Sequence, residues 1–486
     1  MRRRPYLYLF GLGFLYRVLL LWWFPALYGG DSVGRLYYRD SIFFGHWLPF
    51  LQAVIVASYK LTQSVMAVRV IIIAMASTAA MMFYDFVRRL AGERAGFIAG
   101  LLFTFSPLYV YLSLVPYQEV IFLGLLVGAL AFLFDTGWQR GAGFLLYGLA
   151  CLTRYEAWFL LPVVLVMEIR RTGRTVTLAR LKQLFLFVLG ICWGPFLWIA
   201  MSKLHWGEYG AFLFLKGGTA YFWQPEREMV RIIKYAGRML GWIIKFGSPA
   251  MLLAPLGLYF FRKKAGLSGP MCALAWLTSI NLIFLTFVTG REFDNDFRFA
   301  AIPVVFLMVF AAIGVLGVSE KLAARSSSLV RRLLGVCGLL LLTVYAALPV
   351  FRATEQPENS AAYAAAGFLN QNLAEGETAV VLAAGFRDYP QVVPMPCQRV
   401  GAQLNAVGQR VFCSTALPVE TMAALARLGQ RENVRYIVQF GEFEPWTPTD
   451  VVLMEFLHQS GGVSPTVFRE GEVRIVRVNS WDRGGN

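Results

Sequence analysis

The chain has 486 residues, of which 57% are hydrophobic and only 15% charged, with a mean hydropathy of +0.56 and a formal net charge of +16. A soluble protein of this length needs more surface charge, and repeated windows of about 20 apolar residues indicate a polytopic α-helical membrane protein. The positive charge favours anionic lipid or phosphate partners over nucleic acid, because no compact basic domain is present to dock a duplex. The simpler alternative is that this excess marks cytoplasmic loops.

The first apolar run, residues 6–28, is predicted to be an uncleaved span with a cytoplasmic N-terminus. It is longer than a signal-peptide core, and no small-x-small cleavage motif follows it. The stretch YGGDSVGRLYYRD comes next and places Asp31 directly after the span. An apolar stretch at 47–61 is too short to span the membrane and is predicted to lie in or near the outer interface.

Residues 141–169 carry Arg154 and Glu156 near the middle of an apolar run. One helix of this length would be about 44 Å long, whereas the hydrocarbon core is about 30 Å thick. The positive-inside rule favours a short hairpin of two helices with Arg154 at its tip, and about eleven membrane helices in total. The other spans are predicted near 62–87, 95–112, 117–135, 183–202, 239–261, 270–289, 298–318 and 333–351.

A long external loop, 203–238, carries Arg227, Arg231, Lys234 and Arg238. Their spacing would place all four on one face of a helix. A basic ridge of this kind could hold anionic lipid headgroups, or alternatively the phosphate of a lipid substrate.

The chain is predicted to divide into a membrane domain, 1–352, and an extracytoplasmic α/β domain, 353–486. No Gly-rich phosphate loop or metal-ligand cluster occurs in the second domain. Cys397 and Cys413 could form a disulfide there if the compartment is oxidising. The alternation of helices and short apolar strands predicts a helix near 358–374, strands at 378–384, 436–440 and 472–478, and a helix at 450–459.

Four ionisable residues are predicted to lie at one outer level of the membrane, where an embedded charge costs about 3 kcal/mol on insertion scales. They are Asp31, Glu119, Arg154 and Arg298. A carboxylate can take the proton of an attacking hydroxyl, and arginine can stabilise a departing lipid phosphate with its planar donor fork. This combination suits sugar transfer from a polyprenyl-phosphate donor. Attack on one face and departure from the other predict inversion at the anomeric carbon.

The order of motifs resembles the GT-C superfamily of integral-membrane glycosyltransferases, which includes protein O-mannosyltransferases and lipid A aminoarabinose transferases. After the acid that follows the first span come GHWLPF, RRLAGERAGFIAGLLFTFSPLYV, a Glu at the head of the fourth span, GLACLTRYEAWFLLP and FRFAAIPVV. The resemblance covers roughly residues 1–350. Its order of motifs is more specific than any one of them.

The resemblance implies a role for each matching position. Asp31 matches the catalytic acid of the first external loop, and Glu119 matches the acid of the second. Arg154 matches a common basic position, and Arg298 matches the site associated with the lipid phosphate. His46, in GHWLPF, stands where many members carry a His or polar residue before a Pro.

Two positions depart from the pattern that the resemblance implies. Ser32 follows Asp31, and Gln118 precedes Glu119, where the family often has paired acids. With fewer paired carboxylates a divalent metal is not indicated, although it is not excluded, and no cofactor is assigned.

Each candidate also has a plainer interpretation. Asp31 could be an ordinary loop acid, with Asp40 taking the catalytic role instead. Glu119 could complement the dipole of its helix. Arg298 could be an interfacial anchor, and His46 a structural residue.

The sequence therefore predicts an inverting hexosyl- or pentosyltransferase at the outer, periplasmic or extracellular, face of the inner (cytoplasmic) cell membrane. It would move a sugar from a polyprenyl-phosphate donor to a glycan, lipid or protein acceptor. Two alternatives stay open: a glycan ligase or polymerase with a polyprenyl-diphosphate donor, and a lipid-linked sugar transporter, which usually shows internal repeats. The catalytic candidates are Asp31 and Glu119, and the phosphate- or substrate-binding candidates are Arg154, Arg298, His46, Arg227, Arg231 and Lys234.

Overall fold

The chain divides into two compact units in a computed structural model. The first comprises residues 1–23, 43–53 and 71–349, and the second comprises 24–42, 54–70 and 350–486. The predicted boundary between residues 352 and 353 stays a prediction. The structure describes residues 4–25, 30–43, 47–172, 177–207, 209, 237, 240–243, 246–264, 269–288, 297–323, 328–354, 357–374, 376–381, 400, 410–413, 431–440, 466–470 and 473–478.

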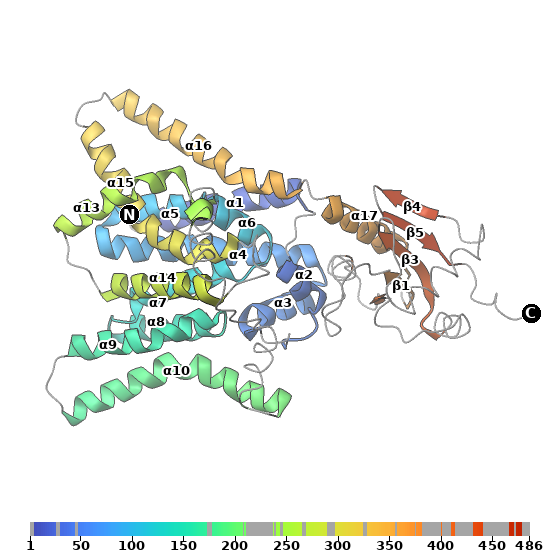
Figure 1. The fold of residues 1–486 in the computed structure, drawn as a ribbon, viewed down its shortest axis with the longest axis horizontal. Coiled ribbons are helices and arrows are strands. Elements are labelled where there is room, and N and C mark those ends of the chain that lie inside the picture. Colours follow the sequence, from blue (N-terminus) through green and yellow to red (C-terminus); the bar gives the residue numbers. More distant parts are fainter. Residues whose placement is uncertain are drawn as a thin grey trace, which may run out of the picture. The chain divides into compact units, whose positions relative to one another are not determined.

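The first unit is a bundle of helices (Figure 1). Its longer helices are α1 (Arg4–Trp23), α4 (Val65–Ala91), α10 (Leu178–Trp206), α14 (Gly269–Val288), α15 (Ala301–Ala323) and α16 (Ser328–Thr354). Its shorter elements are α5 (Glu93–Thr104), α6 (Pro107–Leu114), α7 (Glu119–Phe132), α8 (Gly137–Cys151), α9 (Leu161–Thr172) and α13 (Ala254–Lys264), with the 3-10 turns η1 (Tyr155–Leu160), η3 (Pro249–Leu253) and η4 (Phe297–Ala300).

Within the described residues, the helices are those of an integral membrane protein. Four of them are long and apolar enough to cross a bilayer, in α1, α4, α10 and α15, and a bent pair, α5 with α6, passes the same test. These segments fall on five of the spans predicted from sequence. The total of about eleven membrane helices stays a prediction.

The span expected near 95–112 is broken. α5 and α6 meet at an angle of 54°, because Pro107 starts α6 and the residue before a proline is pushed away from helical geometry. Ser106 is accordingly extended, with φ −73° and ψ 127°. Its hydroxyl lies 3.4 Å from the carbonyl oxygen of Gly247, so a side chain supplies a hydrogen bond at the break.

The hairpin expected at 141–169 is present as two helices, α8 and α9, separated by η1. Side chains satisfy carbonyl groups at this break: the Trp158 indole donates to Cys151 at 2.9 Å and the Tyr147 hydroxyl to Ala157 at 2.7 Å. The prediction that Arg154 lies at the tip is confirmed, because it is the residue directly before η1.

Helices α8, α9 and α10 lie side by side (Figure 1). Glycines let α8 and α10 approach closely, because a Cβ atom on Gly194 would lie only 2.4 Å from the carbonyl oxygen of Gly148. A similar approach joins α13 to α15, where a Cβ on Gly257 would lie 1.7 Å from the Phe310 carbonyl oxygen. Small residues at helix contacts are a common way to pack membrane helices tightly.

The second unit contains α2 (Gly30–Tyr37), most of α3 (Pro49–Thr62), α17 (Pro357–Asn372) and a five-stranded sheet in the order β2-β1-β3-β5-β4. β1 pairs in parallel with β2 and β3, whereas β5 pairs antiparallel with β3 and β4. Alanines and leucines of α17 pack with buried residues of β1, β3 and β5. The strands are β1 (Thr378–Val381), β2 (Arg410–Cys413), β3 (Val434–Phe440), β4 (Thr466–Glu470) and β5 (Val473–Arg477).

Helix α17 and strands β1, β3 and β5 fall where the sequence predicts them. β2 and β4 were not predicted. The helix expected at 450–459 lies outside the described residues, as does Cys397, so the disulfide to Cys413 stays a prediction. The extracytoplasmic position of this part of the chain also stays a prediction.

Candidate functional site

Three of the predicted site residues come together at one end of the helical unit. Glu119 is the first residue of α7, Arg154 stands at the hairpin break, and Arg298 lies in η4 just before α15. Their side chains are only 3%, 10% and 9% exposed. Arg154 forms an ion pair with Glu119, and the Arg298 Nε lies 4.0 Å from the same carboxylate oxygen. The structure brings together these three of the four residues that were predicted to share one level, and their functional roles stay predictions.

Glu156 is a fourth member of the site that the sequence analysis did not assign. The Arg154 Nε donates to its carboxylate at 2.9 Å, and a second nitrogen of Arg154 contacts the same oxygen. Arg154 therefore bridges two carboxylates that come from different elements. Position 118 is a Gln, and the second carboxylate that contacts Arg154 comes from the hairpin.

These four side chains line a pocket together with apolar side chains. Tyr117 contacts Arg298, and its ring centroid lies 5.2 Å from the Arg298 guanidinium carbon. The other residues that line the pocket are Phe122, Leu123, Ala301 and Ile302.

Burial and neighbouring charges shift the pKa values of the two arginines in the site. Burial alone would lower the pKa of Arg154, but the carboxylates of Glu156 and Glu119 outweigh it and hold that pKa above its usual value. Burial lowers the pKa of Arg298 to about 9, which leaves its guanidinium charged at neutral pH. Both arginines are thus cations in a partly desolvated pocket, where they contact the carboxylates of Glu119 and Glu156.

A buried arginine outside the pocket connects the first span to the segment that carries Glu119. Arg17 is fully buried in α1 and donates to the Ser113 hydroxyl at 2.7 Å and to the Gly13 carbonyl at 3.1 Å. Ser113 lies on α6, a few residues before Glu119. Sequence reasoning overlooked Arg17, although an arginine inside an apolar run was a visible signal.

The roles of the remaining candidates stay predictions. Asp31 lies in α2, which belongs to the second unit, and its side chain is outside what the structure describes. His46 and the loop residues Arg227, Arg231 and Lys234 are also outside the described residues. In the described part of the chain no three His, Cys, Asp or Glu residues form a group that could hold a metal ion.

Solved structures share this arrangement of helices. A crystal structure of ArnT from Cupriavidus metallidurans in the apo state is 15% identical and covers 95% of this chain and 96% of its own, with a TM-score of 0.59. The same protein bound to undecaprenyl phosphate is 14% identical, with coverage of 96% and 98% and a TM-score of 0.60. This chain has the GT-C fold.

A third structure extends the likeness within the GT-C fold. The Archaeoglobus fulgidus oligosaccharyltransferase, in complex with Zn and sulfate, is 15% identical, covers 90% of this chain and 68% of its own, and has a TM-score of 0.51. No protein-family model and no curated protein matches the sequence. At these identities the likeness concerns the GT-C fold alone, and the site has to be interpreted from its own residues.

Proposed function

We propose that this protein is an inverting glycosyltransferase that moves a sugar from a polyprenyl-phosphate donor to a glycan, lipid or protein acceptor. The observation that carries the proposal is the pair of buried arginines, Arg154 and Arg298, beside Glu119 in one pocket of a GT-C fold. Two guanidinium groups at the end of a membrane helix bundle suit the phosphate of a lipid whose chain lies in the bilayer.

The arginines act on the leaving group. As the acceptor oxygen attacks the anomeric carbon, the bond from that carbon to the phosphate oxygen breaks and its electron pair stays on the phosphate. Arg154 and Arg298 stabilise this growing negative charge more than they stabilise the intact donor, which is the condition for catalysis. Because the nucleophile enters opposite the leaving phosphate, the anomeric configuration inverts.

The carboxylates serve the acceptor side. In the proposal Asp31 is the general base that takes the acceptor's hydroxyl proton, on the strength of its position after the first span. Glu119 assists by positioning the acceptor and by keeping Arg154 in place, and Glu156 holds the same arginine from the other side. His46 and the basic residues Arg227, Arg231 and Lys234 are proposed to add contacts to the donor.

The sidedness of the reaction is also part of the proposal. The pocket lies at the end of the bundle where α7 begins and α8 ends. In the proposed topology this end faces the periplasm or cell exterior, with the N-terminus in the cytoplasm and the 353–486 segment outside the inner membrane. There a lipid-linked donor meets a polar acceptor, consistent with a role in the cell envelope.

The test compares donor binding with turnover in the purified protein. Wild type, Asp31→Asn and the matched control Asp40→Asn are reconstituted in lipid and given a panel of radiolabelled polyprenyl-phosphate sugars. We expect one donor to be turned over by wild type and by Asp40→Asn. Asp31→Asn should bind that donor with unchanged affinity and lose turnover by about 10²–10⁴-fold, as for loss of a general base.

Two outcomes would contradict the proposal. Full turnover by Asp31→Asn would remove Asp31 as the base. Binding of polyprenyl-diphosphate glycans, but of no monophosphate donor, would replace the proposed transferase with a ligase or polymerase. The anomeric configuration of the product, determined by NMR, tests inversion separately.

A further inference from the structure

The two arginines of the pocket lie at equivalent places in two separate turns. Arg154 stands directly before η1, and Arg298 lies in η4. Each 3-10 turn leads into an apolar helix, α9 or α15. The two guanidinium groups converge on the same carboxylate oxygen of Glu119. Because the two cations repel each other, and because a 3-10 turn has poor hydrogen-bond geometry of its own, this convergence depends on support from neighbouring elements.

A buried tyrosine holds the turn that carries Arg298. The Tyr109 hydroxyl donates to the Ala301 carbonyl at 2.6 Å, and Ala301 stands three residues after Arg298. Tyr109 lies on α6, is completely buried and stacks on Phe103 with ring centroids 4.3 Å apart. Ala301 also lines the pocket. The hydroxyl therefore fixes the backbone at the point where η4 continues into α15.

A second buried tyrosine makes the same kind of contact beside Arg154. The Tyr147 hydroxyl of α8 donates to the Ala157 carbonyl at 2.7 Å. Ala157 again stands three residues after the arginine, and both Tyr147 and Ala157 are completely buried. Each arginine is thus followed, at the same spacing, by a carbonyl group that accepts a hydrogen bond from a tyrosine of another helix.

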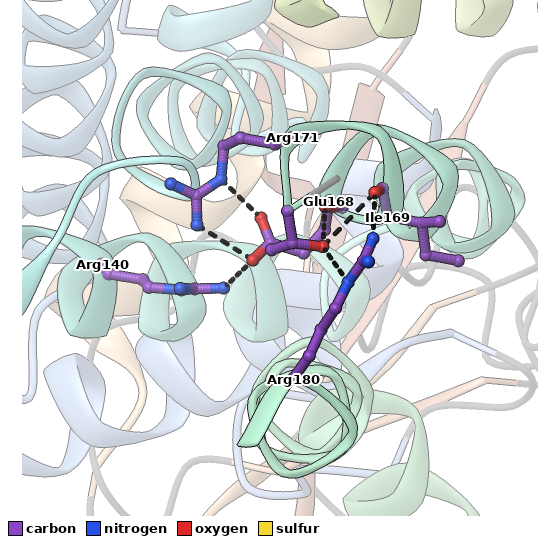
Figure 2. Close-up of polar contacts among 6 residues, drawn as sticks. Arg140, Glu168, Ile169, Arg171 and Arg180 are labelled. Atoms are coloured by element: carbon purple, nitrogen blue, oxygen red, sulfur yellow. Dashed lines mark hydrogen bonds and ion pairs between the residues drawn. The ribbon is translucent and has the colours of Figure 1, made fainter. Parts of the chain in front are cut away.

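Ion pairs fix the far end of the hairpin that carries Arg154. Figure 2 shows Glu168 of α9 between Arg140 of α8 and Arg171. Arg140 donates to one carboxylate oxygen at 2.6 Å, and Arg171 donates to both, at 2.9 and 3.0 Å. Tyr147 follows Arg140 by seven residues, about 10 Å along α8, and provides a second connection close to the break. Two connections at separate points along α8 restrict the movement of the turn more than either does alone.

A plainer interpretation is that these hydroxyl groups only satisfy buried carbonyl oxygens. Phenylalanine would avoid the cost of burying a hydroxyl in apolar surroundings, yet tyrosine stands at both positions. Among the described residues, Tyr109 and Tyr147 are the two tyrosines with no exposed surface, and both contact a segment that carries a pocket arginine. This coincidence favours a role in placing the arginines.

We propose that Tyr109 and Tyr147 are positioning residues for Arg298 and Arg154. Each hydroxyl holds the turn that carries one arginine, so that the two guanidinium groups meet the donor phosphate together. Neither tyrosine lines the pocket, so each acts through its arginine. The inference rests on the proposed function, because the phosphate of the lipid donor is the ligand that both arginines share in it.

Tyrosine-to-phenylalanine variants test the inference, because they remove one oxygen atom and keep the ring. Wild type, Tyr109→Phe and Tyr147→Phe are placed in lipid nanodiscs and titrated with tritium-labelled undecaprenyl phosphate, which supplies the phosphate without requiring the sugar to be known. We expect each variant to bind about three- to tenfold more weakly, which is a part of the loss expected when the arginine itself is removed. The two tyrosines are tested separately, so either variant decides the question if the other fails to fold.

Tyr16→Phe is the matched control. The Tyr16 hydroxyl donates to the Thr343 carbonyl at 2.6 Å, and its ring contacts Phe105, but neither Tyr16 nor Thr343 lines the pocket. The control loses the same kind of hydrogen bond, and its affinity for undecaprenyl phosphate should stay within about twofold of wild type, as expected for a site without shared partners.

A double-variant comparison separates positioning from plain support of the fold. If Tyr109 acts through Arg298, Tyr109→Phe should change binding by less than about twofold in an Arg298→Gln background. Tyr147→Phe should keep its full effect in that background, because it acts through the other arginine. A tyrosine that only stabilises the fold would add its loss in either background.

The outcomes distinguish this inference from the proposed function. Wild-type affinity in both phenylalanine variants would overturn the inference and leave the proposed function standing. An equal loss in Tyr16→Phe, or an undiminished effect of Tyr109→Phe in the Arg298→Gln background, would make the tyrosines structural supports only. If wild type itself bound no undecaprenyl phosphate, the proposed function would lose its donor and the inference would fall with it.

Discussion

Replacing Arg154 with methionine would show how far the two acids of the pocket depend on one cation. Arg154 pairs with Glu119, which is 3% exposed, and with Glu156, which is 21% exposed. Removing one partner of a buried ion pair typically costs about 3–5 kcal/mol, because the other charge is left without compensation. We therefore expect Arg154→Met to lower the free energy of unfolding by about this amount and to abolish sugar transfer.

The double variant Arg154→Met/Glu119→Gln separates stability from function. Removing the stranded carboxylate should restore about 2–3 kcal/mol of the loss, a coupling expected for residues in direct contact. Sugar transfer should stay absent, because the phosphate has lost its arginine. Glu156→Gln is the milder control, and should cost about 1 kcal/mol because Glu156 is partly exposed.

Stability is measured by SDS titration in mixed micelles, and transfer with the labelled donor. A cost below about 1 kcal/mol for Arg154→Met would refute the view that the pair is buried and strong. Recovery of transfer in the double variant would refute a role for Arg154 in binding the donor, and would leave it a structural residue.

Three further variants test other parts of the structure. Arg298→Gln should weaken donor binding by about 10–100-fold, which is the contribution of one charge-assisted hydrogen bond. Binding is measured in a titration with labelled donor, and an unchanged affinity would exclude Arg298 from the donor site. Gly194→Ala should lower the melting temperature, because its methyl group would meet the backbone of α8. Gly141→Ala, whose methyl group would meet open space, should be neutral or slightly stabilising. Equal effects of the two variants would contradict the close approach of α8 and α10. Ser113→Ala should cost about 1–3 kcal/mol in the SDS titration, because the buried guanidinium of α1 loses its hydroxyl acceptor, and the exposed Ser279→Ala should cost less than 0.5 kcal/mol. Similar costs for the two serines would mean that the buried guanidinium finds another acceptor.

Several features of the membrane unit were predictable because single residues conflict with their surroundings. Arg154 stands in an apolar run too long for one helix, which predicted the hairpin and its tip. Glu119 and Arg298 begin apolar runs, so a consistent topology placed them at one level. A charged residue in or beside an apolar run is visible in the local sequence, so it can be recognised without knowing which residues it contacts in the fold.

Other features depend on partners that are distant in sequence. The pairing of Arg154 with Glu119 joins residues that are 35 positions apart, whereas Glu156 stands two residues after Arg154 and could have been assigned from the sequence. β2 and β4 are short edge strands whose identity comes from pairing across the chain rather than from their own patterns. The bend at Ser106 was a different omission, since Ser-Pro was a sufficient signal for a break.

The balance of charge in the pocket has a kinetic consequence. Arg154 and Arg298 face two carboxylates, so these four side chains sum to zero and any anion must compete with Glu119 and Glu156 for the guanidinium groups. A sugar phosphodiester carries one negative charge, whereas the lipid phosphate left after transfer carries nearly two. In the proposed reaction the spent carrier competes better than the fresh donor does. Turnover would then be limited by departure of the carrier lipid, and its accumulation in the membrane would slow the enzyme.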